Sequence, residues 1–465
     1  MDTAIVVFTR DLRLHDNPAL HQACSRARQV VPLFVFDPAL NPPPNRARFL
    51  AESLADLREA LCARGGYLVI RHGNPAAEII RLATQTQAAA VYIADDVSRY
   101  AARRRHALQQ ECARHRLDLT VTPGLTVVPP GDLTPAACDH YRVFTPYYRA
   151  WRATSWRHPH PVPAVIDTPK IRPVDRIPSP PAGTSPNLLP GGEQPARQRL
   201  SAWLDRAHPG FEPAHSGSHA AQSCTSGLAA YPANHDDLPA DQTSRLSPYL
   251  KFGCLSPLEL ALSALDPSGL SSIAAHAGTA PPIGAEEFCR QLAWRDFFYQ
   301  VTAAFPDIAS RDYRPAARTW REDSGALEAW QAGRTGIPIV DAGMRQLAAE
   351  GFMHNRARMI TASFLTRNLG LDWRHGCRHF SALLADADVA NNAGNWQWVA
   401  GTGNNTRPNR IMNPLRQARR FDPAGDYVRR YVPELAALDP SDVHTPWHLP
   451  GRQRPGYPAP IVELA

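Results

Sequence analysis

Residues 4–37, AIVVFTRDLRLHDNPALHQACSRARQVVPLFVFD, decide the fold class of the N-terminal part of the chain. Two apolar runs rich in valine flank the segment 17–28, in which the apolar residues have helical spacing. The order strand, helix, strand is typical of a parallel sheet with helices on its faces. The alternation continues with further strands expected at residues 67–73, 89–96 and 117–124 and further helices at residues 46–64, 75–87 and 98–115.

We therefore predict that residues 1–130 form an α/β domain with a parallel, Rossmann-like sheet. Polar residues mark the carboxyl ends of its strands, namely Arg10, Asp11, Asp37 and Asp95. Ligands of such sheets bind in the crevice beyond these ends, so the four side chains are placed to line one. No GxGxxG pattern follows the first strand, which argues against ordinary dinucleotide binding there.

The apolar pattern changes after this domain. Residues 131–199 are rich in proline and have little periodicity, and we expect a long linker there. From Gln242 onward the spacing of apolar residues is helical and strand patterns are few. We predict an all-helical second domain over residues 200–465.

Composition limits the class of protein. The 465 residues suffice for two or three domains, eight cysteines include no CxxC pair, and no run of eighteen apolar residues occurs. We expect no membrane span, no disulfide framework and no metal site. The N-terminus, MDTAIVVFTRDLR, is predicted to be a strand and not a secretion signal, which indicates a cytoplasmic protein.

The net charge is +7, and arginine supplies nearly all of the positive charge. An excess of this size is compatible with a nucleic-acid partner, although a solvated basic face remains the default explanation of any single cluster.

Residues 386–398, DADVANNAGNWQW, combine two carboxylates, three asparagines and two tryptophans. On a helix Asp388, Asn392 and Trp396 recur every four residues and share one face, whereas Trp398 points roughly 200° away from Trp396. Buried polar groups are costly unless they are hydrogen-bonded, so this face is not that of an ordinary core helix. It fits either a polar, planar ligand flanked by redox-active aromatic rings, or a helix end with capping groups and two packed tryptophans.

Two shorter clusters also belong to the expected helical domain. TSRLS at 243–247 precedes an apolar run and predicts a helix N-terminus, which either is capped by a hydroxyl or binds phosphate. In QLAWR, Gln291, Trp294 and Arg295 share a helical face. That face is suited to stacking on a base and hydrogen-bonding it, or simply to packing one tryptophan among polar neighbours.

A third cluster is HNRARM at 354–359, in which Asn355 and Met359 share one helical face and His354 and Arg358 the next. We expect Arg358 to form an ion pair with Asp386 or Asp388. Ligand positioning explains such a pair better than stability does, because desolvation offsets most of the gain from a buried ion pair.

Several long motifs resemble the photolyase/cryptochrome family, in the same order, along nearly the whole chain. They are most similar to the class I photolyases that repair cyclobutane pyrimidine dimers in DNA. The motifs are FTRDLRLHDNPAL, FTPYYRAW, TSRLSPYLKFG, LAWRDFF, TGIPIVDAGMRQL, GFMHNRARMITASFLTRNLGLDWRHG, DADVANNAGNWQW and RIMNPLRQARRFDP.

The resemblance implies an antenna-binding N-terminal domain and a helical domain that holds FAD in a U shape. Asn392 would face flavin N5, a position at which plant cryptochromes carry Asp. The residues implied to hold FAD are Tyr231, Thr243, Ser244, Leu246, Ser247, Asn355, Arg358, Asp386, Asp388 and Asn392.

The implied reaction is light-driven electron transfer from reduced FAD to the dimer, which splits and returns the electron. Trp396, Trp373 and Trp320 match the tryptophan chain that carries an electron from the protein surface to oxidised flavin. The residues implied to bind the lesion and its flanking phosphates are Gln291, Trp294, Asn355, Arg356, Met359, Trp398 and Arg410.

One residue departs from the family pattern. Dimer photolyases carry Glu three residues before the pocket tryptophan, and this chain has Gln291. Gln at this position resembles (6-4) photolyases and animal cryptochromes, but those have two histidines where this chain has Asn355 and Met359. We expect dimer repair that is real but submaximal, because the amide keeps a hydrogen-bond donor and loses the acid.

The main alternative is a blue-light signalling cryptochrome with little or no repair activity. The sequence ends at Ala465, soon after the last family motif and without a long tail, which favours repair. We expect a monomer that acts on damaged DNA. An antenna chromophore is also expected, with 8-hydroxy-5-deazaflavin favoured over methenyltetrahydrofolate, because Arg46, Asp96 and Lys251 match residues around a deazaflavin. An empty crevice or a second flavin stays open.

Overall fold

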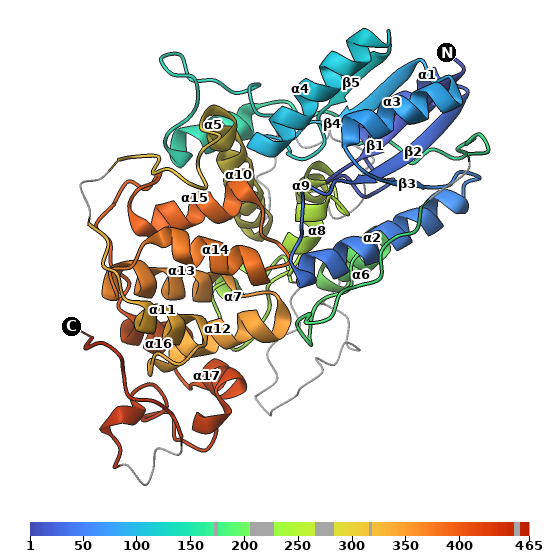
Figure 1. Ribbon diagram of the computed structural model, residues 1–465. Helices are drawn as coiled ribbons and strands as arrows, with labels where there is room; N and C mark the ends of the chain where they lie inside the picture. Colours follow the sequence, from blue (N-terminus) through green and yellow to red (C-terminus); the bar gives the residue numbers. More distant parts are fainter. Residues whose placement is uncertain (172–174, 205–226, 266–282, 316–318, 451–455, 465) are drawn as a thin grey trace. The chain divides into compact units, whose positions relative to one another are not determined.

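The computed structural model describes residues 1–171, 175–204, 227–265, 283–315, 319–450 and 456–464. The chain separates into two compact units (Figure 1). The first comprises Met1–Ala182, Pro190–Ala229 and Ser244–Pro306, and the second comprises Gly183–Leu189, Ala230–Thr243 and Asp307–Ala465.

A five-stranded parallel sheet forms the core of the first unit, as the alternating pattern predicts. Its strands are β1 (Thr3–Phe8), β2 (Gln29–Phe36), β3 (Val69–His72), β4 (Ala90–Ala94) and β5 (Asp118–Thr122), and their order is β3-β2-β1-β4-β5. Side chains such as Ile5, Val31 and Val91 are fully buried, which explains why the strands are continuous apolar runs and do not alternate. The α/β prediction is confirmed.

Helices connect the strands: α1 (Pro18–Arg26), α2 (Pro44–Cys62), α3 (Pro75–Thr86) and α4 (Arg99–Arg114). Asn17, Asn74 and Ser98 cap α1, α3 and α4 by accepting a hydrogen bond from the backbone amide three residues on. All four helices begin and end within two residues of the predicted ranges.

Five further helices belong to the first unit: α5 (Phe144–Ala153), α6 (Glu193–Leu204), α8 (Ser247–Phe252), α9 (Pro257–Leu265) and α10 (Ile283–Ala304). The prediction that residues 131–199 are all linker missed α5, in which Phe144, Tyr147 and Trp151 are buried at helical spacing. An extended stretch without helix or strand runs between α5 and α6 over the described residues. The compact units do not follow the boundary at residue 199, and the division into domains stays a prediction.

The second unit is helical. Its helices are α7 (Tyr231–Asn234), α11 (Ser324–Gln331), α12 (Pro338–Glu350), α13 (Asn355–Ser363), α14 (Trp373–Leu383), α15 (Val389–Ala400), α16 (Pro414–Phe421) and α17 (Asp426–Tyr431), with the π-helical turn Phe364–Asn368 after α13. Helix α12 packs against α13 and α17, and α14 lies beside α15 (Figure 1). Among the described residues of the whole chain, no helix is both long and apolar enough to cross a membrane.

Asp296 on α10 is a buried anchor of the first unit. Its Oδ2 atom accepts hydrogen bonds from the backbone amides of Val127 (2.9 Å) and Val128 (3.0 Å) and from the indole of Trp151 (3.0 Å). Its Oδ1 atom is buried and accepts no hydrogen bond from the described residues, although Nη1 of Arg295 lies 3.7 Å away. Burial raises the pKa of Asp296 to about 6, against the lowering effect of the Arg295 charge.

We predict that Asp296→Asn removes a pH-dependent loss of stability. The pKa of Asp296 is raised from 3.8 to about 6 in the folded state, so its contribution to stability is full at low pH and falls as the pH rises towards 6. An asparagine keeps an oxygen for the three donors and does not titrate. The free energy of unfolding of the variant, relative to the native protein, should rise by up to ~3 kcal/mol between about pH 4 and 7.

Urea unfolding at the two pH values measures this difference. Asp296→Ala is the control: it does not titrate either, so it should show the same change with pH relative to the native protein, but it leaves the three donors unsatisfied and should be less stable than Asp296→Asn by ~2 kcal/mol at either pH. A difference between Asp296→Asn and the native protein that does not change with pH would contradict the account.

Candidate functional site

An ion pair joins α13 to the segment before α15 in the second unit. Arg358 donates through both terminal nitrogens to Asp386, at 3.0 and 2.7 Å, and through Nε to the carbonyl of Met353 at 2.8 Å. The Asp386 side chain is almost fully buried. Of the two partners predicted for Arg358, the structure selects Asp386.

Asp388 has a different task, because it is the N-cap of α15. Its carboxylate accepts from the backbone amide of Asn391 at 2.7 Å and from the Asn391 side chain at 3.0 Å. The capping interpretation of this part of the motif is therefore confirmed. The helix begins at Val389, one residue after Asp388. Asp388 is therefore not itself a helical residue on the face of Asn392 and Trp396, as the sequence analysis had placed it.

The Asn392 side chain is fixed against α14. Its Nδ2 atom donates to the carbonyl of Cys377 at 3.0 Å and to the hydroxyl of Ser381 at 2.8 Å, with the Cys377 thiol at 3.3 Å. These contacts occupy the amide hydrogens. The carbonyl oxygen of Asn392 is consequently the atom that remains for a ligand.

Trp396 is buried where α14 and α15 approach each other most closely. A Cβ atom on Gly376 would overlap the Trp396 ring, so only glycine permits this approach. Phe380 and Trp330 pack edge-on against the same ring, with centroids 4.9 and 6.0 Å away. One side of Trp396 is thereby held by apolar contacts that keep water away from it.

Trp373 and Trp320 are the other members of the predicted chain, and only Trp320 is partly exposed. Trp373, at the first turn of α14, is fully buried, and Trp320 is half-buried. The backbone of Arg321, next to Trp320, donates to Gly370 at 2.8 Å, which holds that segment beside the start of α14. The set runs from buried to partly exposed indoles, as a relay from the surface requires.

Thr243 is a further candidate for FAD binding. Its hydroxyl oxygen is buried and has no hydrogen-bond partner among the described residues. A buried polar atom of this kind is rare unless a ligand, ion or water completes it. Together with a carboxylate, an amide oxygen and a guanidinium in the same unit, it matches the donors and acceptors that the pyrophosphate, ribityl and isoalloxazine groups of FAD require.

The other residues predicted to hold FAD divide between the units. Ser244, Leu246 and Ser247 belong to the first unit, and Tyr231 starts α7 in the second. Leu246 is the N-cap of α8 and no side chain caps this helix, so the hydroxyl-capping interpretation of residues 243–247 was wrong. Asn355 starts α13 and is exposed, with Nδ2 3.9 Å from the sulfur of Met359, which confirms their shared face.

Two predicted lesion residues lie on α10 in the first unit. Trp294 is half-buried and stacks face to face with Phe144, with ring centroids 3.6 Å apart. Gln291 donates through its amide to Glu287 at 3.3 Å. A carboxylate therefore stands one helical turn before the position at which the family pattern has its acid.

Arg356 has an internal partner. Its guanidinium is paired with the Asp236 carboxylate and lies 4.2 Å from the centroid of the Phe421 ring. A DNA phosphate at this arginine would have to compete with that carboxylate, so the assignment of Arg356 to phosphate stays a prediction with a named competitor.

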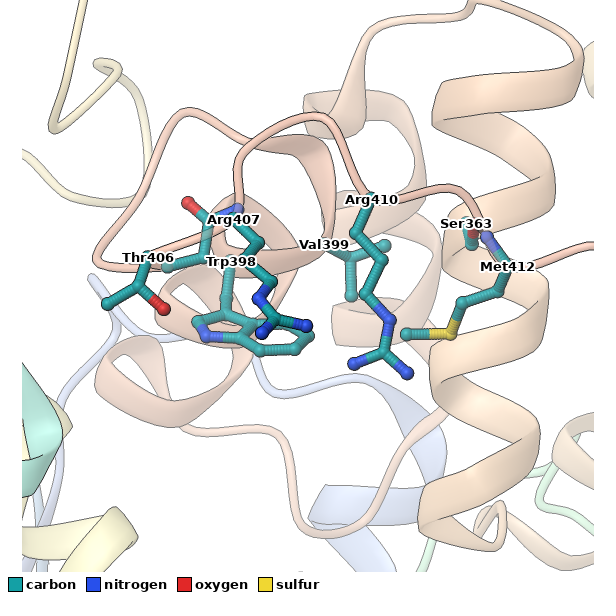
Figure 2. Close-up of a pocket in the computed structure, with 8 residues that line it drawn as sticks. Ser363, Trp398, Val399, Thr406, Arg407, Arg410 and Met412 are labelled. Carbon is teal, nitrogen blue, oxygen red and sulfur yellow. Dashed lines mark hydrogen bonds between the residues drawn. The ribbon is translucent and has the colours of Figure 1, made fainter.

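Arg410 and Trp398 line a cavity of about 320 Å³ in the second unit (Figure 2). Ser363, Val399, Asn405, Thr406, Arg407 and Met412 complete its lining. Figure 2 shows the guanidinium groups of Arg407 and Arg410 pointing to the same side as the Trp398 ring. Neither guanidinium has an ion-pair partner among the described residues, in contrast to Arg356.

Arg407 was missed by the sequence analysis, although it stands three residues before Arg410 in the same exposed loop. Arg367 fixes this loop by donating to the carbonyls of Val399, at 3.0 Å, and Pro408. Two arginines in one braced loop, beside a tryptophan, suit a phosphate and a stacked base.

Arg10 and Asp96, which follow β1 and β4 at the edge of the sheet where a ligand crevice is predicted, contact each other, and the crevice itself stays a prediction. Arg10 pairs with Asp96 at 3.4 Å and donates to the carbonyl of Lys251 at 3.0 Å and the hydroxyl of Tyr299 at 2.6 Å. Burial acts to raise the pKa of Asp96, but the charges of Arg10 and Arg104 lower it below its usual value. Asp96 is thus held as a carboxylate at this edge of the sheet. Arg46, the third antenna candidate, is half-buried on the first turn of α2.

Two family models match this chain, one in its N-terminal part and one in its C-terminal part. Residues 4–167 match the family model for DNA photolyase, and residues 288–465 match the model for the FAD binding domain of DNA photolyase. The chain is similar to the deoxyribodipyrimidine photo-lyase of Streptomyces griseus, with 46% identity over 100% of this chain and 97% of the relative. It is also 34% identical to a cryptochrome DASH of Gloeobacter violaceus, over 99% and 93% of the two chains.

Two solved structures share the fold over almost all of their length. A class III photolyase from Agrobacterium tumefaciens has a TM-score of 0.87 and 32% identity, covering 100% of this chain and 95% of that one. An archaeal photolyase from Sulfolobus tokodaii, solved with two FAD molecules, has a TM-score of 0.81 and 28% identity, covering 99% and 96%.

We predict that Asp386→Asn lowers the amount of FAD that stays bound to the purified protein by about tenfold, because it leaves the Arg358 guanidinium without its carboxylate in a mostly buried position. Glu434→Gln is the matched control, since Arg345 also donates to Glu434 through a two-oxygen contact, at 2.9 and 2.7 Å, away from this site. Flavin absorbance per chain after gel filtration is the measurement. Equal flavin content in the two variants would remove Asp386 from the site.

Proposed function

We propose a function for this chain, which belongs to the photolyase/cryptochrome family. It is a deoxyribodipyrimidine photo-lyase and uses light and reduced FAD to split cyclobutane pyrimidine dimers in DNA. The observation that carries the proposal is the pairing of Asn392 and Trp396 on one face of α15, both fixed by α14. This arrangement combines a ligand acceptor with a buried oxidisable ring.

FAD supplies the light-driven electron transfer when it is bound, and the protein orients it and excludes water. Thr243 offers a buried hydroxyl for a phosphate oxygen, and the Arg358–Asp386 pair offers a fixed donor and acceptor for the flavin edge. Asn392 presents its carbonyl oxygen because its amide hydrogens are bonded to α14. That oxygen accepts a hydrogen bond, which suits a protonated ring nitrogen better than a bare one.

DNA is the proposed partner of the loop that carries Arg407 and Arg410. Enzymes that act on a base within a duplex, photolyases among them, take the nucleotide out of the stack, which is cheapest for a damaged, poorly stacked pair. Trp398 offers a ring for such a base, and the two arginines neutralise backbone phosphates. We propose that Trp294 and Gln291 of the first unit and Met359 and Asn355 of the second unit also contribute to lesion binding.

The proposal extends to the antenna and the state of the protein. We propose an 8-hydroxy-5-deazaflavin antenna near Asp96 and Lys251, where Arg10 fixes a carboxylate and a backbone carbonyl. The second FAD of the Sulfolobus tokodaii structure makes a flavin antenna the rival. We further propose that the protein acts as a cytoplasmic monomer. The absorption spectrum of the purified protein distinguishes the two antennas.

We predict that the native protein splits dimers and that Gln291→Glu splits more of them per absorbed photon. The variant restores an acid at the position where dimer photolyases have Glu, a change expected to contribute ~1 kcal/mol, or about fivefold. The assay is loss of thymine dimers from a short oligonucleotide under blue light with reduced protein. Glu287→Gln is the control, because it removes the neighbouring carboxylate and leaves the amide at position 291 in place.

Each outcome of this assay has a meaning. Repair by neither protein would favour a signalling cryptochrome, the second candidate, in line with the similarity to a cryptochrome DASH. Repair by Gln291→Glu alone would indicate that the native protein has lost repair activity. Equal or better repair by the native protein would show that the pocket is built around the amide.

We predict that Arg410→Ala and Arg407→Ala each weaken binding to damaged and undamaged duplexes alike. Each should reduce the slope of log affinity against log salt by about one, because one phosphate contact is lost. Arg416→Ala, on the exposed face of α16, is the control for the removal of a surface arginine. A loss confined to damaged DNA would mean that the substituted arginine contacts the lesion itself.

A further inference from the structure

We infer that Asp312 is a positioning residue for electron transfer through Trp373. The indole Nε1 of Trp373, which is fully buried, donates to Oδ1 of Asp312 at 2.9 Å. The inference rests on the proposed tryptophan chain and adds to it a residue that contacts neither flavin nor DNA.

The surroundings of Trp373 contain a cation that opposes its oxidation. The guanidinium carbon of Arg374 lies 4.8 Å from the centroid of the Trp373 ring. A cation over an electron-rich ring is favourable while the ring is neutral. It becomes repulsive once the ring has lost an electron and carries a positive charge.

Two carboxylates form ion pairs with Arg374. Arg374 Nη2 pairs with Asp312 at 2.9 Å, and Arg374 Nη1 pairs with Asp372 at 3.1 Å. Only Asp312 also accepts from the indole. Its charge therefore acts on the ring twice, through the hydrogen bond to Nε1 and by neutralising Arg374.

The hydrogen bond from Trp373 to Asp312 does more than satisfy a buried indole N–H group, as comparison with two other buried tryptophans indicates. Trp330 is equally buried and satisfies its Nε1 with the backbone carbonyl of Thr361 at 3.0 Å, which needs no charged group. Trp151 donates to Asp296, but that carboxylate is fully buried and holds two backbone amides as well. The Asp312 side chain is 20% exposed, so it keeps contact with solvent while it bonds the indole.

The electron balance of the step is simple. When oxidised FAD is bound and excited by light, Trp396 would give it one electron, and Trp373 would then give one electron to Trp396. Trp396 returns to its neutral state and Trp373 becomes a radical cation beside the Asp312 carboxylate. The indole proton stays in the hydrogen bond to Asp312, and Trp320 restores Trp373 by giving up an electron in its turn. A carboxylate stabilises the charge at the middle position and so keeps it from returning to Trp396.

The experiment compares Asp312→Asn with Asp372→Asn. The first keeps an oxygen for the indole and removes the charge, and the second removes a charge from the same guanidinium without touching the indole. Laser flash photolysis with oxidised FAD bound measures the lifetime of the tryptophan radicals and the yield of photoreduction. We expect Asp312→Asn to lower the yield by about tenfold, which is ~1.4 kcal/mol, the difference between a charged and a neutral hydrogen bond.

Asp372→Asn should change the yield by less than about twofold, and Asp312→Glu, which keeps the charge, should recover most of it. A readout without flavin is the proton resonance of the Trp373 indole in the apoprotein. It should move upfield in Asp312→Asn and stay in place in Asp372→Asn, because only the first variant weakens the bond to Nε1.

The outcomes separate this inference from the proposed function. Photoreduction that survives Trp373→Phe and Trp396→Phe would remove the tryptophan chain itself. Photoreduction lost in those variants but unchanged in Asp312→Asn, with the indole resonance shifted, would overturn the role of Asp312 alone. Equal losses in Asp312→Asn and Asp372→Asn would also overturn it, because they would show that only the charge of Arg374 matters.

Discussion

The close approach of α14 and α15 at Gly376 is the constraint on which the candidate site depends. Glycine leaves the space that the Trp396 ring fills, and any side chain there would separate the two helices. The approach also brings Asn392 within hydrogen-bond distance of Cys377, the next residue of α14, and of Ser381, five residues after Gly376. A single missing Cβ atom therefore determines the position of the Trp396 ring and the orientation of the Asn392 amide together.

A buried polar network joins the start of α13 to α12 and α17. The Gln346 side chain accepts from the backbone of His354 at 3.1 Å and from the hydroxyl of Tyr427 at 2.8 Å. Tyr431 donates to Glu350 on the same face of α12 at 2.5 Å. Because His354 is the N-cap of α13, these bonds set where Arg358 starts its reach to Asp386. Hydrogen bonds between buried polar groups thus fix the start of α13 relative to α12.

The spacing of apolar residues and the positions of turn and capping residues were sufficient to predict the parallel sheet of the first unit and its helices α1 to α4. Asn17, Asn74 and Ser98 mark helix starts in the sequence, and each one does cap its helix. The pairing of Arg358 with one of two nearby aspartates was also predictable, because both partners lie in motifs with helical spacing. Helix α5 was missed because prolines on both sides obscure a short apolar stripe.

Contacts of residues that lie outside the recognised motifs, such as Asp312 and Asp236, could not be predicted. Nothing around Asp312 marks it, and its bond to Trp373 spans 61 residues. The partner of Arg356, Asp236, is 120 residues away, so a motif that suggests a phosphate contact gives no warning of an internal competitor. The spacing of apolar residues predicts which helical face a residue occupies, whereas its contact partner depends on packing that no local pattern encodes.

The most direct test of the account is to illuminate the reduced, flavin-loaded native protein with a thymine-dimer oligonucleotide and count dimers lost per absorbed photon. The account predicts loss of dimers in blue light and none in the dark, and a protein that holds FAD but leaves the dimers intact in light would contradict it.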